Sequence, residues 1–363
     1  MDPLTHLALG AAIANVGFRD RLGRSALWVG AGIAACADLD LFLPRLLAAV
    51  GKPAEFGLWT LHRGPTHSLL WAVLGGALLG FCWFVWRAFW RQRRDKPFCD
   101  RLGACGWMIL LGVLAALSHP LLDTCTSYGT QLFWQPGELS ARHSWDCIAI
   151  VDLFFGGILV WGLLCSMLYR RRKPAQTRRA VIAGALTILL AVEYLALGAV
   201  CREAAINEVR GMALPHRIER VRAVPSPGSL LLWRVVVKTP HSWQLCRVHL
   251  LAGKDRPIRM TIIPTRSEGA IPIAVRESKA FAVFHWFTAG WMTYATGRDA
   301  QGVWLDCIDL RYAVRADDSE PLWKMRFRLD DSQNLLGYQF LSHPHMRNGE
   351  SRLSRLIYDQ INP

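Results

Sequence analysis

The sequence predicts an α-helical integral membrane domain of about six transmembrane helices, followed by a mainly antiparallel β domain. Of the 363 residues, 52% are apolar and only 19% are charged, whereas soluble domains carry roughly 25% charged residues. Long uncharged runs recur before Cys201, and short alternating segments follow it. This composition excludes a disordered, collagen-like or disulfide-scaffold protein, and the sixteen tryptophans suit a membrane interface.

Four runs are long enough to cross the hydrocarbon core of a bilayer. Residues 68–86, 102–118 and 153–169 contain no charge, and residues 180–201 are interrupted only by Glu193. A buried helix of a soluble protein could imitate one such run, but four in series indicate membrane helices.

Two weaker segments precede these runs. Residues 3–18 are apolar apart from His6 and Asn15. Residues 25–50 are also apolar, apart from three charged residues: Asp38, Asp40 and Arg45. We expect both segments to be membrane helices, which brings the total to six.

Basic residues gather in three alternate connections between these segments, and the other connections hold few. They are Arg19, Arg21 and Arg24; Arg87, Arg91, Arg93, Arg94, Lys96 and Arg101; and Arg170, Arg171, Arg172, Lys173, Arg178 and Arg179. The positive-inside rule makes these connections cytoplasmic and places the N-terminus and everything after residue 202 outside. The net charge of +14 therefore reflects topology and contact with membrane lipids, and no nucleic-acid partner is expected.

The chain after the last span reads as a separate β domain. Short strands are expected at residues 217–224, 230–238, 243–252, 258–263, 302–312, 322–330 and 336–342. Residues 276–287 fit either a helix or another strand. The predicted domains are residues 1–203 in the membrane and residues 204–363 in the periplasm. Cys246 and Cys307 fall on predicted strands, and a disulfide between them is one possibility.

An unusual set of polar residues lies within or beside the membrane segments. They are His6, Asp38, Asp40, His62, Arg63, His67, His119, Asp123 and Asp152. Counted at 1.5 Å per helical residue, those on five of the helices sit roughly 18–30 Å from the cytoplasmic face. Ionisable groups at that depth are costly and functional by default. One shared site explains their common depth better than five unrelated positions do.

The residue types favour a metal site, because imidazole and carboxylate together suit zinc, manganese or iron. His119 and Asp123 are four residues apart on one helical face and form a workable chelating pair. Asp38 and Asp40 cannot both face the same way in a regular helix, so either the helix breaks there or only one of them binds metal. Arg63 could hold an anionic oxygen.

Each residue taken singly also has a simpler interpretation. His6 could be a polar residue near the N-terminus, and Asp152 could begin a helix and favour its dipole. Asp38 and Asp40 could cap a helix or pair with Arg45. The set as a whole favours metal, because charge buried in lipid needs partners and a metal ion is a common one.

At these residues the chain resembles the YdjM-like membrane-bound metal-dependent hydrolases, a group also described as LexA-binding and inner-membrane-associated. The resemblance covers roughly residues 1–200 and rests on Thr-His at 5–6, Asp-Leu-Asp at 38–40, HRGPTHS at 62–68 and HPLLD at 119–123. The tail, with Pro225, Pro227 and Trp233, is similar to the C-terminal extension of some members. The resemblance implies a metal-dependent hydrolase in the bacterial inner membrane and implies no substrate.

We therefore expect a multi-pass inner-membrane hydrolase that uses a metal-activated water on an amphiphilic or lipid-like ester, phosphoester or amide. Zinc is favoured, with manganese or iron as alternatives. The expected metal ligands are His6, Asp38, His67, His119 and Asp123, with Asp40 bridging or adjacent. His62 and Arg63 would stabilise developing negative charge or protonate the leaving group, and Asp152 would orient a ligand histidine.

Two alternatives remain open at this point. One is an intramembrane amidase or ceramidase-like lipid hydrolase. The other is a non-catalytic protein, either a metal transporter or an assembly factor with a structural metal site. Transport is disfavoured because residues 75–86 and 103–115, on the cytoplasmic side of the expected site, carry no charge.

Overall fold

A computed structural model describes residues 1–52, 55–92, 101–172, 177–212, 216–252, 257–265, 271–313 and 321–342, together with residues 269, 316 and 319. Contacts divide the chain into two units. The first is Met1–Trp145 with Ile150–Leu197, and the second is Asp146–Ala149 with Gly198–Pro363.

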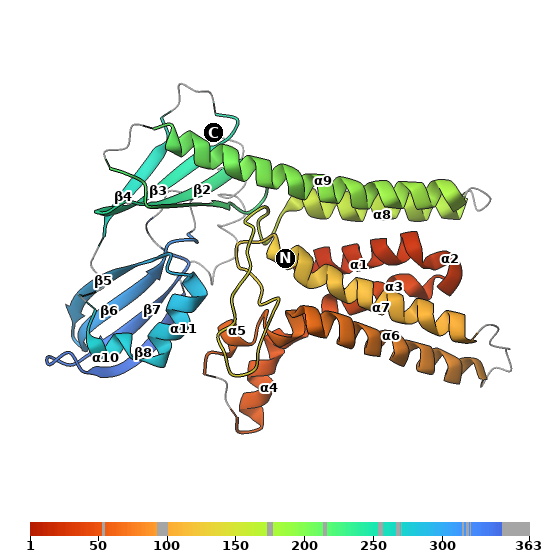
Figure 1. Cartoon of the computed structure of the whole chain (residues 1–363), viewed down its shortest axis with the longest axis horizontal. Coiled ribbons are helices and arrows are strands. Elements are labelled where there is room, and N and C mark those ends of the chain that lie inside the picture. Colours follow the sequence, from red (N-terminus) through yellow and green to blue (C-terminus); the bar gives the residue numbers. More distant parts are fainter. Residues whose placement is uncertain are drawn as a thin grey trace. The chain divides into compact units, whose positions relative to one another are not determined.

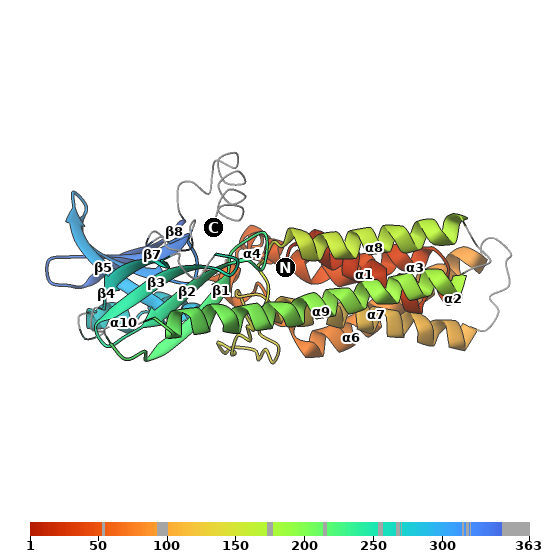
Figure 2. The same ribbon diagram turned by 90° about the horizontal axis from the view of Figure 1, so that it is seen from above.

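The first unit is helical (Figures 1 and 2). Its elements are α1 (Pro3–Gly17), α2 (Arg19–Leu22), α3 (Ser25–Ala35), η1 (Cys36–Phe42), α4 (Leu43–Ala49), α5 (Gly57–Thr60), η2 (Pro65–His67), α6 (Leu69–Gln92), α7 (Arg101–Thr124), α8 (Leu153–Arg172) and α9 (Thr177–Arg210), of which η1 and η2 are 3₁₀ helices. Helix α9 continues from the first unit into the second.

Five stretches of the described chain are long and apolar enough to cross a membrane: Ser25–Ala49, Leu69–Trp90, Leu102–Thr124, Leu153–Arg171 and Thr177–Arg210. The sixth expected span corresponds to α1, which has 15 residues and is shorter than a typical transmembrane helix. It nevertheless packs against α3, α7 and α8 within the bundle. The expectation of a helical membrane domain with about six helices is therefore confirmed in its essentials.

Glycines set the closest helix crossings. A Cβ added at Gly112 of α7 would overlap the backbone oxygen of Gly76 in α6, and Gly10 of α1 meets Gly30 of α3 in the same way. Small residues at a crossing let two backbones approach closely, which is how membrane helices commonly associate. These crossings bring together the helices that carry the polar residues.

The basic helix ends gather at one end of this unit, where α2, the end of α6, the start of α7, the end of α8 and the start of α9 lie (Figure 1). Arg170 pairs with Asp20, Arg87 Nη1 donates to Leu22 O at 2.6 Å, and Arg21 lies over the Trp107 ring. Arg93, Arg94, Lys96 and Lys173, which the sequence places in the same connections, lie outside the described residues.

The second unit contains two four-stranded antiparallel sheets. The first has the order β1 (Arg220–Pro225), β2 (Leu232–Lys238), β3 (Ser242–His249), β4 (Arg259–Pro264). The second has the order β5 (Met292–Asp299), β6 (Gly302–Asp309), β7 (Trp323–Leu329), β8 (Leu335–Ser342). Two helices, α10 (Ile273–Arg276) and α11 (Lys279–Thr288), precede the second sheet, so the ambiguous segment 276–287 is helical. The β-rich character of this region is confirmed.

Strand β5 escaped prediction because its sequence, MTYATGRD, mixes glycine and charge with few apolar residues. Its buried residues lie at its start, and the rest of the strand is partly buried or exposed. The suggested disulfide is wrong. Cys246 in β3 and Cys307 in β6 are free, buried thiols in different sheets. Burial raises the pKa of Cys246 to about 12 and also raises that of Cys307.

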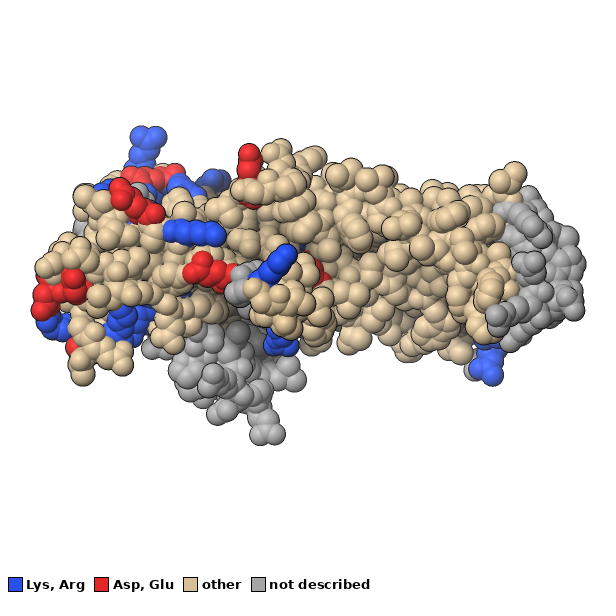
Figure 3. Space-filling view, turned by 90° about the horizontal axis from the view of Figure 1, so that it is seen from below, with Lys and Arg blue, Asp and Glu red and all other residues tan. Residues whose placement is uncertain are grey.

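A hydrophobic cluster joins the sheets of the second unit, where Val236, Trp243 and Leu245 pack against Trp291 and Leu310. The two units also differ in surface chemistry. On the face shown in Figure 3, the helical unit is almost free of charged side chains, whereas acidic and basic residues gather over the β-rich unit. An uncharged surface of exposed apolar side chains is what a bilayer requires of the helical unit.

Candidate metal centre

Helix α1 positions the first site residue. The Asp2 side chain accepts hydrogen bonds from the backbone N–H of Thr5 at 3.0 Å and from the Thr5 hydroxyl at 2.6 Å, which caps the helix. His6 therefore lies in the first turn, fully buried, and its ring stacks on that of His119 with centroids 3.5 Å apart. Neither ring nitrogen of His6 has a hydrogen-bond partner among the described residues.

The 3₁₀ helix η1 allows both aspartates of the Asp-x-Asp pair to face the site. A regular α-helix would point Asp38 and Asp40 apart, but here the α-helix gives way to the tighter 3₁₀ form at Cys36. Asp38 Oδ1 lies 3.4 Å from His119 Nε2 and 3.5 Å from His67 Nε2. Asp40 also lies beside His67, on the side of Nδ1. Because the α-helix breaks at Cys36, both carboxylates enter the site.

Asp40 organises the segment from His62 to His67. Its Oδ1 lies 2.8 Å from His62 Nδ1, and its Oδ2 accepts from the Thr66 hydroxyl at 2.7 Å and the Arg63 backbone N–H at 3.2 Å. Oδ2 also lies 3.1 Å from His67 Nδ1. Both histidines thus direct Nδ1 at a carboxylate, which leaves Nε2 of each available to a metal ion.

Helix α7 supplies the remaining donors. His119 Nδ1 donates to the backbone oxygen of Ala34 at 2.5 Å, which frees Nε2. One turn later, Asp123 Oδ2 lies 3.5 Å from His119 Nε2 and 3.4 Å from His67 Nε2. Asp123 Oδ1 lies 3.3 Å from His6 Nε2 and also pairs with the α-amino group of Met1. The predicted i, i+4 pair, His119 and Asp123, therefore directs both side chains toward the same donors.

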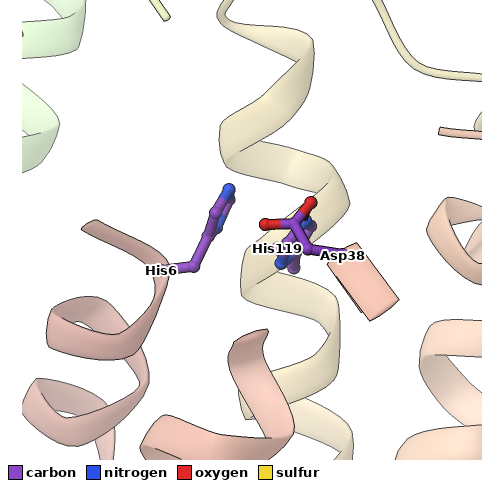
Figure 4. Close-up of side chains that lie close together, drawn as sticks. All are labelled: His6, Asp38 and His119. Atoms are coloured by element: carbon purple, nitrogen blue, oxygen red, sulfur yellow. Dashed lines mark ion pairs between the residues drawn. The ribbon is translucent and has the colours of Figure 1, made fainter. Parts of the chain in front are cut away.

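The donor atoms are spaced as ligands of a common ion would be. The Nε2 atoms of His67 and His119 are 2.9 Å apart. Donors bound at about 2.1 Å to one tetrahedral ion lie about 3.4 Å from each other, close to the carboxylate–imidazole distances above. Figure 4 shows His6 from α1, Asp38 from η1 and His119 from α7 converging from three elements.

Within the described part of the chain, several buried polar atoms of the centre lack a hydrogen-bond partner, whose place a cation would take. His67 and His119 each direct Nδ1 at an acceptor, and their Nε2 atoms approach to 2.9 Å, a contact that needs a proton or a cation between them. Asp38 Oδ2 is buried without a hydrogen-bond donor among the described residues, and Asp123 Oδ2 has no aligned donor there, although it forms an ion pair with Arg63 Nε at 3.0 Å. Buried polar atoms are normally satisfied, and a divalent ion would satisfy these together. The residues present fit a metal ion.

His62 and Arg63 lie beside these donors. The His62 side chain is 14% exposed, and burial lowers its pKa, a shift that the neighbouring Asp40 carboxylate opposes. Arg63 is buried, and its Nε lies 3.0 Å from Asp123 Oδ2. Gly64 follows, where a Cβ would meet the backbone oxygens of Thr60 and Leu61 at 2.8 and 2.9 Å.

Eight of the nine residues expected from the sequence meet in this one place, and Asp152 has a different role. Its Oδ1 accepts from the backbone N–H groups of Phe154 and Phe155 at 3.0 and 2.9 Å, and the Tyr194 hydroxyl donates to it at 3.0 Å. Asp152 thus caps α8, its simpler interpretation, and the contacts described for its carboxylate include no site histidine.

Several contributors escaped the sequence reasoning. Thr66 bridges Asp40 and His67, Thr126 accepts from Arg63 Nη1, and Tyr128 lies under the Arg63 guanidinium. Thr66 stands inside the motif that the sequence singles out, so its position was a usable signal. Thr126 and Tyr128 follow α7 in a loop, where no sequence pattern distinguishes them.

The comparisons with known proteins bear on the helical unit. A family model described as YdjM inner membrane protein matches residues 1–202, which contain every residue of the centre. No curated protein and no solved structure matches the chain.

Proposed function

Because this chain belongs to the YdjM inner membrane protein family, we propose that it is a membrane-embedded, metal-dependent hydrolase of an amphiphilic substrate. The observation that carries the proposal is the opposed Nε2 pair of His67 and His119, with a carboxylate oxygen of Asp38 and of Asp123 beside it. His6 completes the ligand set from α1.

The donor set favours zinc, with manganese and iron as alternatives, because it mixes imidazole with carboxylate and contains no thiolate. A bound ion of this kind supplies Lewis acidity and a nucleophilic water near neutral pH. Asp40 holds His62 and His67 in the tautomers that leave Nε2 free. His62, the most exposed of the histidines in the cluster, is the group placed to carry a proton to or from substrate.

The surroundings of the centre support a lipid-like substrate. Directly after Asp38 the chain exposes Leu39, Phe42 and Leu46, with 64%, 58% and 66% of their surfaces accessible. The basic helix ends lie at the other end of the unit, about 27 Å from His119 if the 18 residues from Arg101 are counted along α7. This supports a site in the outer leaflet of the inner membrane that admits lipid-like molecules, with the β-rich unit in the periplasm.

The test is the metal content of detergent-purified protein, measured by elemental mass spectrometry. We expect one or two transition-metal ions per chain, lost in a His67→Ala/Asp123→Ala variant that remains folded by circular dichroism. The matched control is His143→Ala, which changes a loop histidine whose ring packs on Phe133. Protein that is metal-free and cannot be reconstituted would rule out the hydrolase.

A structural metal site is the second candidate, and one observation favours it. His6, His67, His119 and Asp123 are all completely buried, and closed sites are typical of structural zinc. His62→Gln separates the two, because this residue lies beside the ligands. A hydrolase would keep its metal and lose turnover of ester or phosphoester lipids, whereas a structural site would keep both its metal and the function of the protein in the cell.

A further inference from the structure

We propose that the group hydrolysed at this centre is a phosphoryl group, bound through the guanidinium of Arg63. This inference rests on the proposed function and narrows its substrate from any ester or amide to a phosphoester.

Arg63 brings into the centre a buried hydrogen-bond donor that has no aligned acceptor among the residues that the structure describes. Its side chain is 4% exposed. A guanidinium carries five N–H donors, and one of them, on Nη1, bonds to the Thr126 hydroxyl at 2.8 Å. Nε is buried and has no aligned acceptor among the described residues, although Asp123 lies 3.0 Å away. A buried N–H without an aligned acceptor is costly, and an acceptor oxygen of a bound ligand would satisfy it.

The backbone of Arg63 is held in a conformation that side chains rarely adopt. Its φ is 57°, in the left-handed region. The Asp40 carboxylate accepts its N–H, and its carbonyl oxygen accepts from Gln131 N at 3.0 Å, so both sides of the residue are fixed. Strain of this kind persists only where the surroundings enforce it. Here it directs the guanidinium at Asp123, over the ring of Tyr128.

The shape of the guanidinium distinguishes phosphoryl from acyl transfer. Acyl transfer develops charge on a single oxygen, whereas a phosphoryl group spreads it over three. The planar fork of arginine can hold two of these oxygens at once. Because Asp123 contacts both Arg63 and the histidines, a group at the centre is within reach of both. Hydrolysis then forms a P–O bond from water, breaks the P–O bond to the alcohol and leaves one proton of the water on the departing oxygen.

The experiment uses the full-length protein loaded with Co²⁺, whose visible absorption reports ligands at the centre. Two probes are titrated: inorganic phosphate, which needs the guanidinium, and acetohydroxamate, a planar chelator that needs only the ion. In Arg63→Lys we expect phosphate to bind about 10-fold more weakly or worse, because the bidentate contact is lost. Acetohydroxamate should change by no more than about 2-fold. Arg142→Lys, on the other Arg that stacks on Tyr128, is the control.

The outcomes separate this inference from the proposed function. If the wild-type protein binds acetohydroxamate but not phosphate, the phosphoryl substrate is rejected and the proposed hydrolase is not. This comparison uses the wild-type protein alone and does not depend on the folding of a variant. Equal phosphate affinity in wild type and Arg63→Lys also rejects the phosphoryl substrate. Protein that takes up no Co²⁺ rejects the metal centre itself.

A second pair of probes identifies the source of the phosphoryl group. Dihexanoyl phosphatidic acid presents it on a lipid, and glycerol 3-phosphate presents it in water. Tighter binding of the lipid, lost in Arg63→Lys, supports a lipid phosphoester. Equal affinities support a water-soluble phosphoester.

Discussion

Asp40 contacts four other residues of the centre and occupies no position that a metal ligand must take. The sequence offered it as a bridging or adjacent carboxylate, because Asp-x-Asp spacing alone cannot tell a ligand from a supporting residue. The structure engages its two oxygens with His62, Arg63, Thr66 and His67. Asp40 is therefore a positioning residue, which sets the tautomers of two histidines and the backbone of the arginine.

Asp40→Asn tests this role. The amide replaces one acceptor oxygen with a donor, so it cannot accept from all of these groups, and supporting residues of this kind are worth 10–100-fold in metal affinity. We expect a loss of about that size in a competition titration against a chelator. Asp20→Asn, which removes the carboxylate paired with Arg170, is the control. Wild-type affinity in Asp40→Asn would contradict the assignment.

Asp306 gives the β-rich unit a pH-dependent element. Burial disfavours its ionised form, but hydrogen bonds from Arg326 and Lys324 outweigh burial and lower the pKa of Asp306. The pKa of Asp306 in the folded protein lies below the unfolded value of about 3.9. The ion pairs of Asp306 therefore stabilise the fold above that pH, and this stabilisation is lost as pH falls through the folded pKa.

Asp306→Asn should therefore destabilise the protein near neutral pH by about 2 kcal/mol. The measurement is thermal unfolding followed by tryptophan fluorescence, at pH values from 7 downwards. The difference between wild type and variant should shrink once pH falls below about 4. A difference that stays constant to lower pH would show that the pair does not hold the carboxylate ionised.

At the scale of elements, periodicity and charge predicted what is regular and missed what is local. The uncharged runs gave α6, α7, α8 and α9, because a bilayer demands length and apolarity that sequence displays directly. The break at Asp38 was one of two alternatives, since the sequence does not show that the α-helix gives way to the 3₁₀ form of η1 at Cys36. The short α4 and α5 have no such signature. The helices approach one another where glycines of two helices face each other, and a single sequence does not show which glycines do so.

Gly112→Ala tests the crossing of α6 and α7. The added methyl would overlap the backbone oxygen of Gly76, so the helices must separate, at a cost of about 1–3 kcal/mol. His119 lies on α7 and His67 just before α6, so metal content should fall as well. Gly106→Ala lies on the same helix with open space around it and should leave unfolding temperature and metal content unchanged or slightly improved. Equal behaviour of the two variants would contradict the crossing.

At the scale of the molecule, topology remains a prediction from charge. The described basic helix ends meet at one end of the helical unit (Figure 1), as the positive-inside rule requires of cytoplasmic connections. We expect alkaline phosphatase fused after residue 205 to be active, because it is exported, and the same reporter fused after residue 172 to be inactive. An inactive fusion after residue 205, expressed at an equal level, would invert the arrangement.

The short segment Asp146–Ala149 makes the two units inseparable by a single cut. It lies in the loop between α7 and α8 but belongs to the β-rich unit, where Asp146 pairs with Arg222 at 2.8 Å and Ile148 is fully buried. A chain ending near residue 202 would keep this segment and lose the partners that cover it, exposing an apolar patch some twenty residues beyond Asp123. The β-rich unit thus includes four residues that the sequence places between two membrane helices. Cutting the chain once near residue 202 therefore does not yield either unit complete.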